Sequence, residues 1–160
     1  MLDQLIKNID EQVLDTVIVD SFDWLISTVG DNSVRLNNIN FREVRNPFSK
    51  KRELLLRWSY SRKELGLKRE YLALMDYNTN QIKLYCRKKA TLAITLDTLF
   101  HEFRHSQQSS YLYGYYTRIE KLGYYEHPLE RDANEFAEKM MPIYWQENSW
   151  KFERDSLSLK

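Results

Sequence analysis

The chain has 160 residues, of which 42% are hydrophobic and 29% are charged, and its formal net charge is +1 at pH 7. This length suits one ordinary domain with a core of its own, so we expect a single domain over residues 1–160. The composition excludes a disordered segment, and no stretch approaches the roughly 20 apolar residues that cross a bilayer, which excludes a membrane protein.

The first predicted element is a helix that begins after Asp10 and ends at Gly30. Aspartate is suited to capping the start of a helix, and glycine to ending one. Apolar residues recur between them at spacings of three and four, which is typical of a helix with one buried side: Leu14, Ile18, Phe22, Leu25 and Val29. Residues 31–50 are expected to be mostly irregular, with a short strand near residues 40–44.

Three strands are predicted next. Residues 52–60 alternate between two faces with the period of two that a half-buried strand requires. The second and third strands are residues 71–77 and 81–86. The segment between them, residues 78–80, contains two asparagines, which tolerate the backbone angles of a hairpin turn. The pattern predicts a mainly antiparallel sheet of three to four strands with one buried face.

The strand region is also the most basic part of the chain. Residues 42–89 contain fourteen Lys and Arg against five Asp and Glu. Such a block can attract nucleic acid or another acidic partner. Its charges stand between apolar strand positions, however, and the solvated outer face of a sheet accounts for that pattern. Nucleic-acid binding is therefore the less favoured interpretation.

The only cysteine is Cys86, so no internal disulfide can form. The first residues lack the basic start, apolar block and cleavage site of a secretion signal. We expect a cytoplasmic protein in which Cys86 packs as a small residue of the third strand and has no chemical role. Nothing in the sequence indicates the oligomeric state.

The period of the apolar residues becomes helical from Thr91 onward. Four of them form one stripe along residues 91–108: Leu92, Leu96, Leu99 and Phe103. Because a helix turns about 100° per residue, His101 and His105 project together from nearly the opposite side. We expect this stripe to face the core and both imidazoles to point away from it.

Residues 106–127 are expected to connect this helix to the next, and they hold six of the eleven tyrosines. Pro128 suits the first turn of a new helix, and Glu130 suits the positive end of its dipole. Pro142 is expected to stop that helix. A last amphipathic helix over residues 143–154 would pack Trp145 and Trp150.

The stretch from His101 to His105 reads His-Glu-x-x-His. Histidines one helical turn apart can bind one tetrahedral zinc ion through their ring nitrogens, while Glu102 falls beside the metal. In that place Glu102 can act as the general base that takes a proton from the attacking water. The pattern is short and also occurs in helices that bind nothing, but the amphipathic context favours a zinc site.

A catalytic zinc site needs a third protein ligand and one open position. Glu130 is the preferred candidate, and Asn134 one turn later could orient a ligand histidine. His127 remains open as a ligand, a helix cap or a substrate contact. Asp132 and Glu135 are alternative ligands, but they point to other sides of the helix from Glu130.

Residues 130–142 resemble the second signature of the ImmA/IrrE family of zinc metallopeptidases, which runs Glu-x-Glu-Ala-Asn-x-Phe-Ala and then Leu-Leu-Met-Pro. The matching positions are Glu130, Ala133, Asn134, Phe136, Ala137 and Pro142. The first motif, residues 101–105, precedes it in the family's order, so the resemblance covers about residues 91–142. Arg104 and Asp132 depart from the family pattern, and no separate helix-turn-helix domain precedes the motifs.

The resemblance implies a small α+β, zincin-like domain. It would combine the first helix, the mainly antiparallel sheet, the helix of the histidines and a carboxyl-terminal helix carrying the glutamate ligand. It also implies a cytoplasmic zinc metalloendopeptidase that hydrolyses an intracellular protein with Zn2+, His101, His105, Glu130 and Glu102. Candidates for stabilising the oxyanion are Tyr115, Tyr116, Tyr125 and His127.

Two other functions stay open. The first is a non-catalytic domain in which zinc serves structure or partner binding. The second is a nucleic-acid-binding protein that uses the basic residues 42–89, although this region lacks aromatic residues spaced for base stacking.

Overall fold

The computed structural model describes residues 2–30, 34–38, 52–57, 73–76, 81–85 and 90–154. Where side chains are described as well, 80% of the residues are helical and 5% are in strands. The expected α+β fold class is therefore wrong, because the described chain is mostly helical. One source of the difference is the 106–127 connector, which was expected only to link two helices but contains helical segments of its own.

Helix α1, Glu11–Val29, has the predicted ends. The Asp10 side chain accepts hydrogen bonds from the backbone N–H groups of Gln12 at 3.0 Å and Val13 at 3.3 Å. Gly30 ends the helix at φ 77°, a left-handed conformation that glycine adopts without a steric penalty. A short 3-10 helix, Ile6–Asn8, precedes α1. The prediction for α1 is confirmed.

In the part of the chain that the structure describes, four short strands pair in the order β1-β2-β4-β3. Their bounds are β1 Val34–Asn38, β2 Arg52–Arg57, β3 Ala73–Asp76 and β4 Gln81–Tyr85. The pairs β1–β2 and β2–β4 are parallel, and only β3–β4 is antiparallel. The expected mainly antiparallel sheet is wrong in strand direction. Alternation of side chains indicates a strand but not the direction of its neighbour.

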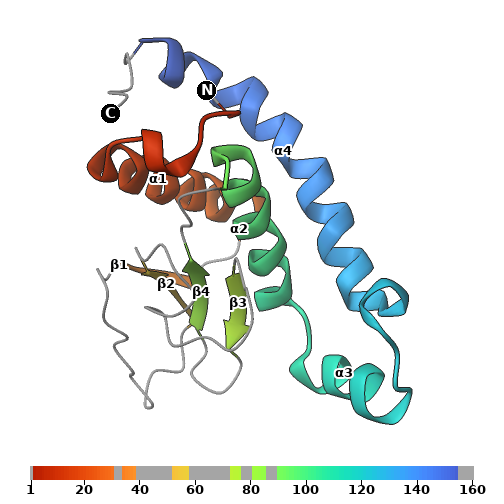
Figure 1. Cartoon of the computed structure of the whole chain (residues 1–160). Coiled ribbons are helices and arrows are strands. Elements are labelled where there is room, and N and C mark those ends of the chain that lie inside the picture. Colours follow the sequence, from red (N-terminus) through yellow and green to blue (C-terminus); the bar gives the residue numbers. More distant parts are fainter. Residues whose placement is uncertain are drawn as a thin grey trace.

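Helix α2, Leu92–Gln107, lies between the strands and α4 (Figure 1). The Thr91 side chain caps it by accepting a hydrogen bond from the N–H of Ile94. The four residues of its predicted stripe are fully buried: Leu92, Leu96, Leu99 and Phe103. The helix contacts α1, β3, β4 and α4, and it is the element around which the described core is arranged.

Helix α4, Pro128–Arg154, continues past Pro142 without interruption. The predictions that Pro142 stops the helix and that residues 143–154 form a separate one are therefore wrong. A proline inside a helix loses one backbone hydrogen bond and costs about 3 kcal/mol. The turns beyond it bury Tyr144, Asn148 and Phe152, which outweighs that cost. Trp145 packs against the core, whereas Trp150 is exposed, contrary to the prediction.

The 106–127 connector contains three short helical segments. They are α3 Ser110–Gly114, a π-helical turn Tyr115–Ile119 and a 3-10 turn Tyr124–Glu126. The segment stands away from α1 and the strands, at the end of α4 that bears Glu130 (Figure 1). Most of its large side chains are exposed, so apolar periodicity could not have predicted these helices.

Some predictions fall outside the described residues. They are the strand near residues 40–44, the placement of Cys86, and most of the basic residues 42–89. Among the helices that the structure describes, none is long and apolar enough to cross a membrane.

Candidate metal centre

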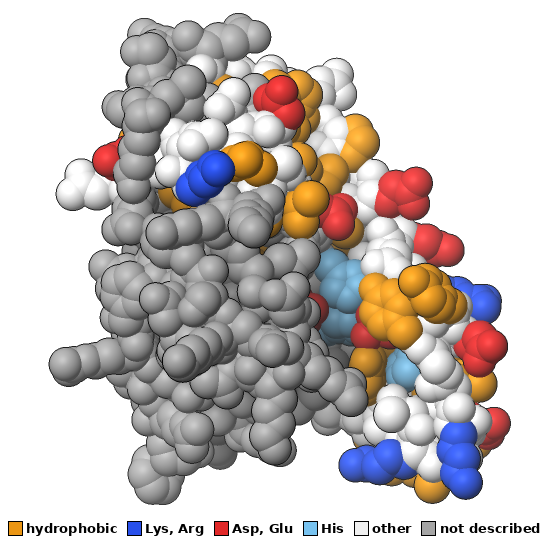
Figure 2. All heavy atoms as spheres, viewed as in Figure 1, with side chains coloured by type: hydrophobic (Ala, Val, Ile, Leu, Met, Phe, Trp, Pro, Cys, Tyr) orange, Lys and Arg blue, Asp and Glu red, His pale blue; other side chains and the backbone are white. Residues whose placement is uncertain are grey.

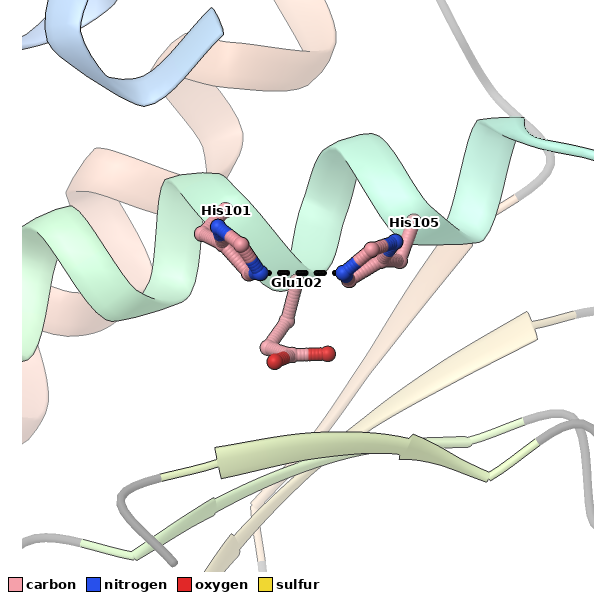
Figure 3. Close-up of side chains that lie close together, drawn as sticks. All are labelled: His101, Glu102 and His105. Atoms are coloured by element: carbon pink, nitrogen blue, oxygen red, sulfur yellow. Dashed lines mark hydrogen bonds between the residues drawn. The ribbon is translucent and has the colours of Figure 1, made fainter. Parts of the chain in front are cut away.

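The two histidines of α2 face each other. Their Nε2 atoms lie 2.9 Å apart, and the two rings are nearly perpendicular (Figure 3). His105 is buried and His101 is half-buried. Both imidazoles lie off the apolar stripe, as the spacing predicts, but they are enclosed by α3 and α4 instead of facing open solvent.

Glu130, in the first turn of α4, meets both imidazoles. Its Oε2 lies 3.1 Å from Nε2 of His101, and its Oε1 lies 3.2 Å from Nε2 of His105. The carboxylate is buried. The packing of α4 against α2 therefore brings Glu130 to two histidines that precede it in the sequence by 25 and 29 residues.

These three residues pass a test of fit to a zinc ion. Ligand atoms about 2.0–2.1 Å from a tetrahedral zinc lie about 3.3 Å from one another. The three side chains form a triangle whose observed separations of 2.9, 3.1 and 3.2 Å are close to that value, with a different oxygen of Glu130 facing each imidazole. Moreover, Oε2 of Glu130 is buried and, apart from its contact with Nε2 of His101, has no hydrogen-bond partner among the described residues. Two imidazoles and one carboxylate are also a usual donor set of catalytic zinc sites.

The electrostatics of the site keep Glu130 ionised. Burial raises its pKa, but hydrogen bonds from His101, His105 and Tyr113 outweigh burial and hold the pKa far below the ordinary value. Burial lowers the pKa of His105, yet the hydrogen bond with Glu130 and the charges of Glu102 and Glu130 raise it overall. Glu130 thus places a negative charge beside both imidazoles, which suits the binding of a cation.

Two residues that the sequence did not single out support the candidate ligands. Tyr113 donates its hydroxyl to Oε1 of Glu130 at 2.6 Å. Gln108 places its Oε1 2.6 Å from Nδ1 of His105. The predicted orienting residue, Asn134, instead accepts a hydrogen bond from the Tyr124 hydroxyl at 3.3 Å. The one available signal was that Gln108 lies three residues after His105, close to one helical turn.

The alternative ligands lie elsewhere. His127 caps α4: its Nδ1 accepts from the N–H of Leu129, while its Nε2 lies 3.2 Å from the Tyr113 carbonyl. Asp132 pairs with Arg104. Glu135 is exposed. Of the open roles for His127, the structure therefore favours the helix cap.

Glu102 lies beside the triangle. It is buried, and its carboxylate comes within 4.8 Å of the ring nitrogens of His101 and His105. Figure 3 shows it leaving α2 between the two imidazoles, with its carboxylate pointing toward the strands. This is the side on which a general base would meet a water beside the metal.

The predicted oxyanion candidates do not meet the triangle. Tyr115 donates to Glu120, and the ring of Tyr116 packs against Tyr115 and His127. Tyr125 is 86% exposed. Of the tyrosines in the described connector, Tyr113 is the one with a hydrogen bond to a candidate ligand.

The enclosure of the histidines is not complete. Figure 2 shows histidine side chains, in pale blue, at the surface beside hydrophobic side chains. No protein-family model matches the chain, and no match was found among curated proteins or solved structures. Evidence for function therefore comes from the geometry and chemistry of this site.

Proposed function

We propose that this chain is a zinc-dependent metalloendopeptidase of the ImmA/IrrE type, which hydrolyses peptide bonds of an intracellular protein in the cytoplasm. The observation that carries the proposal is the triangle of His101, His105 and Glu130 with Glu102 at its side. Two imidazoles, one carboxylate ligand and an adjacent carboxylate outside the ligand set are the parts that zinc-assisted hydrolysis requires.

His101, His105 and Glu130 would hold the zinc ion. When bound, zinc supplies Lewis acidity, which makes a water nucleophilic near neutral pH and polarises a carbonyl group. Glu102 would take the proton from the attacking water and later return it to the leaving amine. Tyr113 keeps the Glu130 carboxylate in place through its 2.6 Å hydrogen bond.

The position of β3 beside α2 supports an extended peptide as the substrate. β3 ends the strand order β1-β2-β4-β3 and contacts α2. Within the described sheet it therefore has a strand neighbour on one side only, and an extended peptide could pair along the other side. Such a peptide would run past Glu102, whose carboxylate points toward the strands.

Cleavage of a peptide library tests the proposal. The full chain, loaded with one equivalent of zinc, is incubated with peptides from a denatured cell extract, and new amino termini are identified by mass spectrometry. We expect cleavage that a chelator abolishes and added zinc restores, because the nucleophilic water depends on the metal. Loaded protein that cleaves no peptide at any site would refute the proposal.

A further inference from the structure

Gln108 bridges the two helices of the site. It immediately follows α2, and its side chain is half-buried. Its Oε1 lies 2.6 Å from Nδ1 of His105. Its Nε2 donates to the Leu129 carbonyl at 2.9 Å and to Oδ2 of Asp132 at 2.8 Å. One amide thus connects a candidate zinc ligand to the first turn of α4.

The surroundings of this amide determine which way it faces. The Leu129 carbonyl and the Asp132 carboxylate can only accept hydrogen bonds, so the NH2 group of Gln108 must point to them. Its oxygen must then face His105, and an amide oxygen only accepts. Nδ1 of His105 therefore carries a proton, and Nε2, which faces His101 and Glu130, is the ring nitrogen that remains to bind a metal ion.

The ion pair between Arg104 and Asp132 in turn holds the Gln108 side chain. Arg104, on α2, donates from Nε to Oδ2 of Asp132 at 2.7 Å and from a terminal nitrogen to Oδ1 at 3.3 Å. Asp132 therefore receives Arg104 and Gln108 together, and its pKa is lowered mainly by the hydrogen bond from Arg104. These are the two residues that depart from the family signature, and here they contact each other.

We propose that Gln108 is a positioning residue of the metal centre: it fixes the proton of His105 on Nδ1, and the Arg104–Asp132 ion pair holds Gln108 in that orientation. The inference rests on the proposed zinc site and adds to it a residue outside both sequence motifs. Groups that orient ligand histidines set the tautomer and increase metal affinity.

Zinc affinity is the first measurement. Gln108→Leu removes the amide, and Gln108→Asn shortens it by one methylene so that it cannot reach both helices. By competition with a chromophoric chelator, both variants should bind zinc about 10- to 100-fold more weakly than the wild type. The matched control Gln146→Leu changes an exposed glutamine of α4 and should leave the affinity unchanged.

The tautomer of His105 is the second measurement, and it does not depend on zinc. Long-range proton–nitrogen NMR spectra of the metal-free full chain report whether Nδ1 of His105 carries a proton. We expect a proton on Nδ1 in the wild type, where the Gln108 oxygen accepts from it, and a lower occupancy of that proton in both Gln108 variants.

Two results would overturn the role of Gln108: a wild-type His105 without a proton on Nδ1, or variants in which both the protonation of Nδ1 and the zinc affinity are unchanged. A wild type that binds no zinc would refute the proposed function instead. The tautomer spectra would still decide whether Gln108 positions His105, so the two failures can be told apart.

Discussion

Glu102→Gln is expected to lower the rate of peptide hydrolysis by about 10²- to 10⁴-fold, which is the usual contribution of a positioned general base. The amide has nearly the shape of the carboxylate but cannot accept the proton of the attacking water. Glu102 takes part in none of the three short contacts among His101, His105 and Glu130. The zinc content of the variant should therefore stay at about one ion per chain.

The matched control for this variant is Glu126→Gln, which changes an exposed glutamate of the connector. It should keep the wild-type rate. Turnover is followed on the best peptide from the library, and metal content is measured on the same samples. A Glu102→Gln protein that holds zinc and cleaves at the wild-type rate would exclude Glu102 as the base and favour a non-catalytic zinc domain.

Glu130→Ala is expected to weaken zinc binding by more than about 100-fold. This exceeds the effect of losing an orienting group, because one of three ligands disappears. The loss should also appear in stability. Zinc at 100 times its dissociation constant raises the free energy of unfolding of the wild type by about 2.7 kcal/mol. The same zinc concentration should barely stabilise the variant.

Two further variants separate Glu130 from the other ligands considered. Glu135→Ala is the matched control on the same helix, and it should bind zinc like the wild type because Glu135 is exposed. His127→Ala should lose stability through its helix cap but retain zinc. If His127→Ala or Glu135→Ala loses the metal and Glu130→Ala keeps it, the ligand assignment is wrong.

The predictions that were confirmed depend on local signals. Asp10 and Gly30 mark the ends of α1 because capping involves only neighbouring backbone groups. The stripe ending at Phe103 marks the buried side of α2 because helical periodicity is a property of the segment itself. The same periodicity places His101 and His105 one turn apart, which was enough to expect their meeting.

The predictions that were wrong concern interactions between distant segments. Proline does weaken a helix, but Tyr144 beyond Pro142 packs against Trp24 of α1 and Phe100 of α2, and this packing keeps α4 continuous. Likewise, the parallel pairing of β2 with β4 depends on the path of the chain between them. Neither can be obtained from propensity alone.

The candidate site was predicted only in part. The meeting of Glu130 with both histidines was predicted from motif order and chemistry. The supporting residues were not predicted, because Gln108 and Tyr113 stand outside any motif and acquire their roles only when α3 and α4 pack beside α2. Asn134, which occupies the motif position, bonds to Tyr124 instead.

The most direct test of the metal centre is the X-ray absorption spectrum of the full chain loaded with one equivalent of zinc. We predict a shell of nitrogen and oxygen ligands at about 2.0–2.1 Å, with the outer scattering of two imidazoles. That imidazole scattering should be reduced by half in His101→Ala. A chain that binds no zinc, or a shell that contains sulfur at about 2.3 Å or lacks imidazole scattering, would contradict the account.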